Sequence, residues 1–403
     1  MSANYKKLGD YIQPVDIRNS DLKVSHLLGV SVEKCFIESI ANTIGTDFSK
    51  YKIVRKGQFT YIPDTSRRGD KIGIALLTDF DEGLVSNIYT VFEITDTTKL
   101  LPEYLMLWFS RPEFDRYARY KSHGSVREIF DWDEMCRVEL PVPDLKEQEK
   151  IVNTYNAITK RIQLKQKINE NLEKTAQCLF ENFYMKYTDF DNEEYFLPDN
   201  WKLGTLNDAV SFTNGYAFPS EDLLDSQKTT DCFKVFKMAN IFKGGGFNYF
   251  GTKSYISKEY CKNLDKWILR NGDILMCMTD MKENIALLGH TALMDRDNEF
   301  IVNQRVGLIR PNNSINISSN YLYLLTNNKK WLKQLRKYAH IGVQVNLTTS
   351  DILNSPIILA PKEINMKFNY NVNPLFKTIQ ENNKEIIKLQ ELKQLVISHI
   401  SEM

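Results

Sequence analysis

The feature of this chain that most constrains its fold is an internal repeat. Four pairs of residues recur at one spacing of 218, namely Gly124 with Gly342, Asp133 with Asp351, Val138 with Pro356, and Pro143 with Pro361. A constant spacing over several landmarks is typical of one supersecondary unit present twice. The alternative, coincidence among short hydrophobic strands, stays open because only one sequence is compared. The repeat predicts two domains of one architecture.

The earlier parts of the two copies also resemble one another. The stretches that pair are 51–57 with 266–272, 72–77 with 284–289, 84–87 with 301–304, and 91–94 with 308–310. Short runs of β-branched and aromatic residues broken by Gly, Asn and Asp predict strands joined by turns. Helical stretches at 102–109 and 319–325 follow, and then come a glycine turn, a short strand that ends in proline, and a long charged segment.

The charged segment after Asp144 has the apolar period of a helix. Its apolar residues recur at steps of three and four: Ile151, Tyr155, Ile158, Ile162, Ile168, Leu172, Leu179 and Phe183. This spacing predicts one long helix with a single apolar face. Asp144 is suited to the N-cap, and Glu147 lies three residues beyond it.

The second charged segment carries a similar stripe. Its members are Leu375, Ile379, Ile386, Leu389, Leu392, Val396 and Ile400. Asn373 followed by Pro374 predicts that this helix begins there, because proline is favoured at the first helical position. Polar residues interrupt both stripes, at Lys165 and at Asn382 and Asn383, and such residues can set the register of a helix pair.

The length of these helices predicts that they pack on each other. About 40 residues at 1.5 Å each make a rod of roughly 60 Å, too long to bury its stripe against one small domain. We therefore expect an antiparallel pair with one domain near each end, related by an approximate two-fold axis. Such a chain could reach two DNA half-sites about one helical turn, ~34 Å, apart.

The predicted fold class is α+β. Two mixed α/β domains are separated by two long antiparallel helices that form a coiled-coil-like spacer, with a pseudo-two-fold internal repeat. The predicted boundaries are 1–143 for the first domain, 144–187 for the first helix, 188–361 for the second domain and 362–403 for the second helix.

Bulk properties indicate a protein of the cytoplasm. The formal net charge is only +1, so any nucleic-acid surface must be a local one. The N-terminus leads into no apolar stretch and no apolar run of about 18 residues occurs, which predicts neither a signal peptide nor a membrane span. The six cysteines are scattered with no C-x-x-C pair, which predicts reduced thiols and no zinc site.

Several motifs resemble those of the specificity subunits of type I restriction-modification systems. The stretch LPDNWKLGTL at 197–206, followed by NGYAF at 214–218, resembles the opening of a recognition domain in that family. The stretch PVPDLKEQ at 141–148 resembles the strand end and start of its spacer helix, and 7–10 is a shorter form of the first motif. The resemblance covers nearly the whole chain and includes its two-copy layout.

This resemblance implies a DNA-binding subunit that is not itself an enzyme. Each recognition domain would read half of an interrupted double-stranded target. The helices would act as a ruler and dock two modification subunits, which bring S-adenosylmethionine, and restriction subunits would complete the nuclease. The second copy departs from the pattern at 361–365, where the usual Pro-Leu-x-Glu-Gln is replaced, which puts the start of the second helix in doubt.

Motifs for chemistry are absent or incomplete. The Asn/Asp-Pro-Pro-aromatic tetrad of adenine methyltransferases is missing, because Pro-Pro occurs nowhere. The glycines at 244–246 and 251 precede Lys253 at the wrong spacing for a Walker loop and predict a surface hairpin. Asp273 and Glu283 match a nuclease motif in part. Two alternatives therefore remain: a methyltransferase or nuclease in a single chain, and a helical scaffold that does not bind DNA.

The candidate DNA contacts are polar residues in predicted turns. Arg can form paired hydrogen bonds with guanine, and Asn or Gln can do so with adenine. Contacts to phosphates are less selective for residue type and carry no sequence information. In the first copy the candidates are Arg67, Arg68, Lys71, Ser125 and Arg127. In the second copy they are Asn214, Tyr216, Lys243, Gln304, Arg305 and Gln344. We predict no catalytic residue and no metal ligand.

Overall fold

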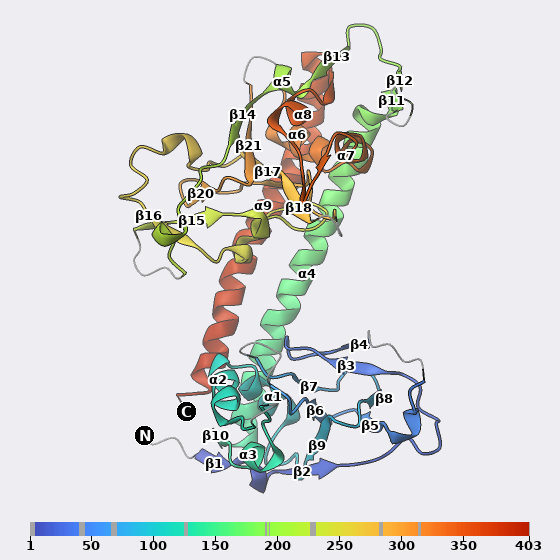
Figure 1. The fold of residues 1–403 in the computed structure, drawn as a ribbon, viewed down its shortest axis with the longest axis vertical. Helices are drawn as coiled ribbons and strands as arrows, with labels where there is room; N and C mark the ends of the chain where they lie inside the picture. Colours follow the sequence, from blue (N-terminus) through green and yellow to red (C-terminus); the bar gives the residue numbers. More distant parts are fainter. Residues whose placement is uncertain are drawn as a thin grey trace. The chain divides into compact units, whose positions relative to one another are not determined.

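The computed structural model describes residues 5–39, 45–65, 71–124, 128–189, 192, 194–225, 231–281, 285–312 and 316–402. These form two compact units (Figure 1), the first made of Met1–Lys165 with Glu385–Met403 and the second of Gln166–Lys384. Each unit contains one globular repeat and part of each long helix. The chain is α+β, as predicted.

The first repeat contains two sheets that recur in the second. A short antiparallel pair joins β1 (Tyr5–Lys7) to β10 (Glu139–Pro141). A four-stranded sheet has the order β2-β9-β6-β7, with bounds Ile12–Val15, Thr90–Ile94, Phe59–Tyr61 and Ile74–Leu76. Two further pairs complete the repeat: β3 (Leu28–Val30) with β4 (Phe36–Glu38), and β5 (Lys52–Arg55) with β8 (Glu82–Val85).

The second repeat has the same core topology. Strands β13 (Lys202–Thr205) and β24 (Pro356–Leu359) form its short antiparallel pair. Its four-stranded sheet has the order β14-β21-β17-β19, with bounds Val210–Asn214, Val306–Pro311, Ile274–Cys277 and Thr291–Leu293. Because strand order and direction agree in both repeats, the duplication predicted from the 218-residue spacing is confirmed.

Other strands surround this shared core. In the second repeat they form two three-stranded sheets, β16-β15-β20 (Tyr255–Ser257, Cys232–Phe236, Phe300–Val302) and β18-β23-β22 (Thr279–Met281, Gln344–Asn346, His340–Ile341). A small pair, β11 (Thr188–Asp189) with β12 (Glu194–Tyr195), precedes this repeat. Short 3-10 helices fill connections, at Leu8–Asp10, Phe48–Lys50, Met185–Tyr187, Ser220–Asp222, Met238–Asn240, Tyr249–Gly251 and Asp265–Trp267.

One turn shows how closely the repeats agree. Gly57 and Gly272 precede the third sheet strand with positive φ angles of 86° and 90°, a conformation that favours glycine. The next residue then accepts a hydrogen bond from the backbone two residues before the glycine. Gln58 Oε1 accepts from Arg55 N at 2.8 Å, and Asp273 Oδ2 accepts from Arg270 N at 2.8 Å.

One sequence pairing is wrong. The stretch 72–77 contains β7, which occupies the end of the first sheet, and its counterpart in the second sheet is β19 (Thr291–Leu293) rather than 284–289. Short aliphatic runs resemble one another at several offsets, and only strand pairing fixes which offset is correct.

Three short helices follow the sheet in each repeat. In the first they are α1 (Pro102–Phe109), α2 (Pro112–Lys121) and α3 (Trp132–Cys136), and proline opens the first two. In the second they are α6 (Ser319–Thr326), α7 (Lys329–Arg336) and α8 (Thr349–Leu353). A further short helix, α5 (Leu206–Ala209), precedes the sheet of the second repeat. The predicted helices at 102–109 and 319–325 are confirmed.

The long helices are α4 (Leu145–Phe183) and α9 (Lys362–His399). Asp144 caps α4, since its Oδ1 accepts from Glu147 N at 2.9 Å, as predicted. In the first unit, Ile158 and Ile162 of α4 contact Ile386 of α9. Nearby, Arg161 and Lys165 bind Glu385 at 2.5 and 2.8 Å.

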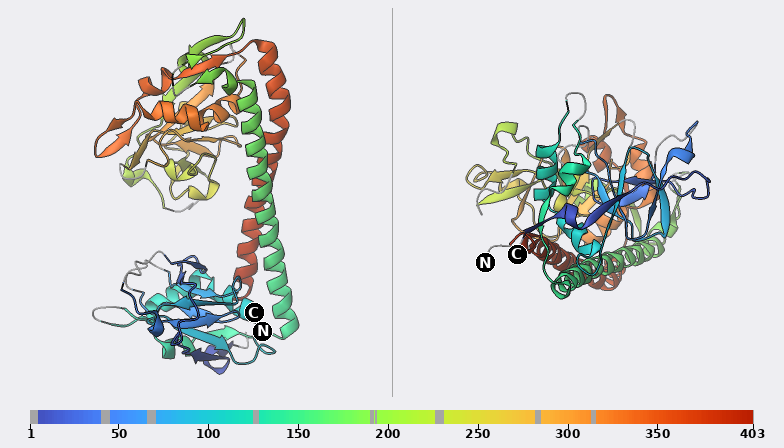
Figure 2. Two further views of the ribbon diagram at one scale, coloured as in Figure 1. Left: turned by 90° about the vertical axis from the view of Figure 1, so that its right-hand side faces the viewer. Right: turned by 90° about the horizontal axis from the view of Figure 1, so that it is seen from below.

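In the second unit the same two helices pack through polar and aromatic contacts. Asn169 Nδ2 donates to Asn383 Oδ1 at 2.9 Å, and Asn382 Nδ2 donates to Asn169 Oδ1 at 2.8 Å. Further along, Tyr184 OH donates to Asn365 Oδ1 at 2.8 Å. The first half of α4 meets the last part of α9 in the first unit, and the last part of α4 meets the first part of α9 in the second unit. The pair is therefore antiparallel (Figure 2), as predicted.

The predicted start of the second helix at Asn373 and Pro374 is wrong. The helix begins at Lys362 and Pro374 lies inside it. The apolar stripe extends before the proline, because Phe368 and Val372 are buried with Phe376 in the core of the second unit. This burial outweighs the one hydrogen bond that proline removes.

Each repeat buries its own core. In the first, Tyr104 and Phe109 of α1 pack on Phe59 and Phe92 of the four-stranded sheet, and Ile400, directly after α9, joins the same cluster. In the second, α6 and α7 cover the sheet, and the ends of both long helices contribute Phe180 and Phe368. Over the described ranges, no helix is both long enough and apolar enough to cross a membrane.

Candidate nucleic-acid interface

Backbone pairing in the second repeat brings most of the predicted contact residues together. Strand β14 ends at Asn214, opposite Gly307, and Tyr216 N then donates to Val302 O at 3.0 Å. A Cβ at Gly215 would lie 2.0 Å from Asn303 O, so only glycine permits this close approach. The turn that carries Gln304 and Arg305 therefore lies against the end of β14.

The hairpin that carries Gln344 joins the same region. Met278 N donates to Arg305 O at 3.3 Å, and the chain continues into β18, where Met281 pairs with Gln344 of β23. Thr349 Oγ1 donates to Asn214 Oδ1 at 3.2 Å and closes the group. We call residues 214–216, 278–281, 303–306 and 340–346 the second loop cluster.

Side chains within this cluster differ in how free they are to bind. Asn214, Gln304 and Arg305 are exposed, and Gln344 is half-buried. Tyr216 differs, because its ring packs 4.9 Å from Phe218 and 5.1 Å from Trp267, centroid to centroid. Tyr216 thus contributes mainly to packing beneath the cluster.

Lys243 lies in a different part of the second repeat. It belongs to a glycine hairpin in which Phe242 N donates to Gly246 O at 3.0 Å, as predicted for a surface hairpin. That hairpin is tied to Thr291, whose carbonyl accepts from Gly246 N at 2.9 Å. The exposed Lys243 side chain is therefore not part of the second loop cluster.

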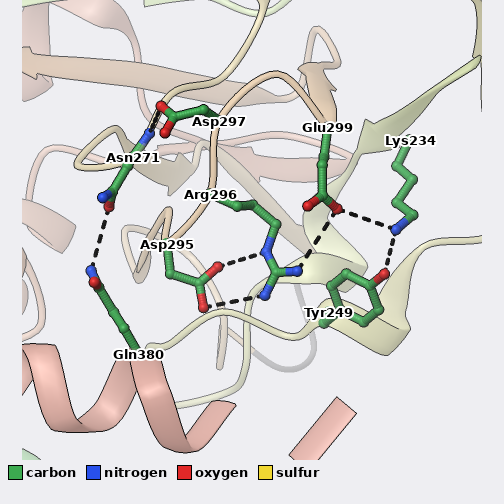
Figure 3. Close-up of polar contacts among 8 residues, drawn as sticks. All are labelled: Lys234, Tyr249, Asn271, Asp295, Arg296, Asp297, Glu299 and Gln380. Carbon is green, nitrogen blue, oxygen red and sulfur yellow. Dashed lines mark hydrogen bonds and ion pairs between the residues drawn. The ribbon is translucent and has the colours of Figure 1, made fainter. Parts of the chain in front are cut away.

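Many cations of the second repeat are already neutralised (Figure 3). Arg296 binds Asp295 at 2.7 Å and lies over the Tyr249 ring, while Lys234 contacts both Tyr249 and Glu299. Likewise, Arg310 binds Asp273 at 2.7 Å. Arg305 is exposed and has no ion pair within the described ranges. Among these arginines, Arg305 is the one left available to a phosphate or a base.

Sequence reasoning missed an apolar hairpin tip in the same cluster. Val343 is 98% exposed and Ile341 is 69% exposed, and Met281 on the neighbouring strand is 59% exposed. Exposed apolar side chains that lie together on adjoining strands can mark an interaction surface. The sequence analysis considered only the polar residue Gln344 at this turn. The apolar residues Ile341 and Val343 on either side of Gly342 are the sequence signal for the exposed tip.

In the first repeat, most predicted contacts lie outside the described residues. These are Arg67, Arg68, Ser125 and Arg127. Lys71 is described, and its Nζ binds Glu33 Oε1 at 2.8 Å while the side chain stays 48% exposed. The neighbouring backbone is held by a buried pair, since Asp115 Oδ1 accepts from both Lys34 Nζ at 2.5 Å and Ile72 N at 3.1 Å.

The described residues beside Arg67 and Arg68 contact those beside Ser125 and Arg127. Thr65 N donates to Glu128 O at 2.9 Å, and His123 N donates to Ile129 O at 3.1 Å. Asp64 forms a bridge with Ile129, in the same way that Asp280 pairs with Val345 in the second repeat. The described ends of the two predicted contact stretches are therefore adjacent, as in the second loop cluster.

Groups that could carry out chemistry are engaged in packing. Asp273, the first carboxylate of the partial nuclease motif, is buried against Arg310, and Glu283 lies outside the described residues. None of the six cysteines forms a disulfide. Burial raises the pKa of Cys277 to about 12 and that of Cys261 to about 11, so neither is a thiolate at neutral pH. No metal-binding group of three or more His, Cys, Asp or Glu is found in the described part of the chain.

Comparison with known proteins identifies the family. The model of the type I restriction modification DNA specificity domain matches the chain twice, over residues 4–174 and 198–391. The chain belongs to this family. The resemblance predicted from the motifs is confirmed, and its two matches correspond to the two repeats.

Two curated relatives carry the name of specificity subunit. The MjaIX subunit of Methanocaldococcus jannaschii is 26% identical over 312 residues, which is 74% of this chain and 68% of that protein. The HindI subunit of Haemophilus influenzae is 28% identical over 162 residues, 40% of this chain and 33% of that protein. The fold is similar to that of the S subunit from M. genitalium, with a TM-score of 0.55, 14% identity, and coverage of 99% of this chain and 96% of that one.

Proposed function

We propose that this specificity-family chain reads a two-part double-stranded DNA target, one half with each repeat, and has no catalytic activity of its own. The observation that carries the proposal is the matching strand bridge, Asp64 with Ile129 and Asp280 with Val345. In both repeats this bridge brings together the described ends of the segments in which the candidate contacts were predicted. Two recognition surfaces in one chain suit a target with two different halves.

The second loop cluster has the chemistry that base recognition needs. Arginine forms paired hydrogen bonds with guanine, and glutamine does so with adenine. Arg305 and Gln304 are adjacent and exposed, and Asn214 and Gln344 lie on the segments beside them. Lys243 and Lys71 suit phosphate contacts, which position the protein without selecting a sequence.

The long helices provide the framework for partners. In this proposal α4 and α9 set the separation of the two half-sites and dock two modification subunits. Those subunits bind S-adenosylmethionine and transfer its methyl group, and restriction subunits join the same assembly to cut DNA. This chain supplies sequence selection alone, in the cytoplasm, where its DNA and partners are.

The proposal can be tested by co-expressing the chain with its cognate modification subunit and sequencing host DNA for N6-methyladenine. We expect methylation at one interrupted two-part motif. Replacing residues 1–143 with those of a relative should change one half of that motif and leave the other unchanged. The matched control replaces residues 188–361 and should change the opposite half.

Other outcomes would favour the alternatives. Methylation by the purified chain without a partner would indicate a single-chain methyltransferase. A helical scaffold would be indicated by two results together. The chain would fail to associate with the modification subunit, and its binding to DNA would be lost when competitor DNA is added. Either result contradicts the proposal.

A further inference from the structure

The tip of the hairpin formed by β22 and β23 is apolar where packing does not require it. Val343 is 98% exposed, and Ile341 across the turn is also largely exposed. An apolar side chain stabilises a fold through the surface that it removes from water, and Val343 removes almost none. Its apolar side chain is therefore available for binding.

The base of this hairpin is held firmly in the second repeat. Val345 is completely buried and Leu347 nearly so, both in the core of that repeat. Strand β23 lies between β18 and β22, and Leu347 N donates to Met278 O at 2.9 Å. On the other strand, His340 Nε2 lies 3.2 Å from Asp351 Oδ2. A tip held in place this way loses little conformational entropy when it binds.

The second loop cluster around the tip suits DNA better than a protein partner. Arg305 and Gln304 are exposed beside it. Asp280 is the one acidic residue of the cluster, and its carboxylate accepts from Met281 N at 2.8 Å and from Leu288 N at 3.1 Å. These backbone donors offset the negative charge that would repel phosphates. Two exposed aliphatic side chains are also far too small for a stable protein interface, which buries about 1,000 Å² or more.

The major groove of DNA matches the tip in shape and in chemistry. In the left view of Figure 2 the hairpin, in orange, projects from its repeat away from the long helices. A two-stranded β-ribbon fits into the major groove. At an A·T pair this groove presents the 5-methyl group of thymine beside N6 and N7 of adenine. Val343 offers methyl groups to the thymine, and the adjacent Gln344 offers an amide to an adenine.

The corresponding turn of the first repeat is polar in sequence. At the spacing of 218 residues, Gly124 corresponds to Gly342 and Ser125 to Val343, with Arg127 close by. A requirement of the shared fold would apply to both turns. The apolar tip is therefore a property of the second repeat alone, as expected for a residue that selects one half of a target whose halves differ.

We propose that Val343 contacts the 5-methyl group of a thymine in the major groove of the half-target bound by the second repeat. This inference rests on the proposed function, namely that the second repeat reads one half of a double-stranded DNA target. It adds the groove, the base and the side chain that recognises that base.

The test removes the thymine methyl groups one at a time. The full chain is bound to its modification subunit, and the probe is a double-stranded oligonucleotide that carries the methylated motif found by sequencing. Each thymine in the half that changes when residues 188–361 are exchanged is replaced singly by deoxyuridine, which lacks only the 5-methyl group. Fluorescence anisotropy titrations measure the affinities. One replacement should weaken binding by about fourfold, the usual effect of losing one buried methyl group.

Three variants connect this loss to the tip. Val343→Ser should weaken binding to the thymine probe by about the same factor and should no longer distinguish thymine from uracil at that position. Val343→Ile keeps the methyl groups and should keep the distinction. Ile88→Ser is the matched control, because Ile88 is an aliphatic residue of the first repeat that is 65% exposed. It should bind both probes like the parent chain.

Equal affinity of the parent chain for every uracil probe would overturn the inference, as would a half-target without thymine. It would also be overturned if Val343→Ser still distinguished thymine from uracil, since the side chain would then contact another part of the DNA. Loss of association between Val343→Ser and the modification subunit would indicate a protein contact instead.

These outcomes differ from failure of the proposed function. In each of them the parent chain still directs methylation to a two-part motif. If the parent chain directs no methylation to such a motif, the proposed function fails, and the inference fails with it.

Discussion

At the scale of single residues, Glu173 of α4 titrates in an unusual range. Burial raises the pKa of its carboxyl from 4.5 to about 7, with the Tyr323 hydroxyl opposing the shift and Glu170 adding to it. The folded chain thus binds this proton more tightly than the unfolded chain. The stabilisation is complete below about pH 4.5 and is lost as pH rises through about 7.

We predict that Glu173→Gln makes the chain more stable at pH 8. A shift of this size corresponds to about 2–3 kcal/mol in the free energy of unfolding. At pH 5 the variant and the parent should be nearly equally stable. Urea unfolding at both pH values checks this, with Glu170→Gln as the exposed control, and an equal gain for both variants would contradict it.

Arg305 differs from Arg296 and Arg310 of the second repeat because it is exposed and has no acidic partner among the described residues. If it binds a guanine, Arg305→Gln should weaken binding to the correct target by about 1–3 kcal/mol and relax selection at one base pair. Lys243→Gln should weaken binding to all sequences and reduce the salt dependence by about one charge. DNA titrations at several salt concentrations distinguish the two roles.

At the scale of helices, the buried side-chain amide of Asn169 joins α4 to α9 within the second unit. Asn169 is 9% exposed and hydrogen-bonds both Asn382 and Asn383. A buried amide is satisfied only when the opposite helix places its partner at the same level. Leucine has no such requirement, so the amides select one alignment of the two helices.

We predict that Asn169→Leu alone lowers the free energy of unfolding by about 1–3 kcal/mol, because it removes the two buried hydrogen bonds that Asn169 makes with Asn382 and Asn383. The double variant with Asn382→Leu should recover most of that loss. Chemical unfolding of both single variants and the double variant measures the coupling. Additive losses would show that the two amides do not depend on each other.

The first turn of each long helix shows a second use of buried amides. Gln148 is fully buried, accepts from Leu101 N at 2.9 Å and donates to Lys99 O at 2.8 Å, which fixes the start of α4 against α1. In the second repeat Asn365 stands 217 residues later and donates to Ala360 O at 3.2 Å. Although the motif at 361–365 is altered, Asn365 therefore keeps a side-chain amide at the position that corresponds to Gln148.

At the scale of the whole molecule, the first unit is built from two distant parts of the chain, whereas the second is one continuous stretch. The C-terminal residues Glu385–Met403 belong to the first unit, where Ile400 is completely buried beside Ile151. Truncation after Lys384 should therefore destabilise the first repeat, although that repeat ends far earlier in the sequence. Limited proteolysis should cut the first repeat quickly and leave the second repeat protected, and equal protection of both would contradict this.

The sequence by itself determined the duplication, the fold class, both long helices and the family. These depend on periodicity and on residues that recur at a constant spacing, and such patterns survive because each repeat must bury the same faces. It also located the cap at Asp144 and the polar breaks at Lys165 and Asn382, since caps and stripes are local.

Only the tertiary structure decided which residues stand together. The start of α9 at Lys362 depends on burial of Phe368 and Val372 against other elements. The grouping of Arg305 with Gln344, the separation of Lys243, and the packing of Tyr216 depend on strand pairing between distant segments.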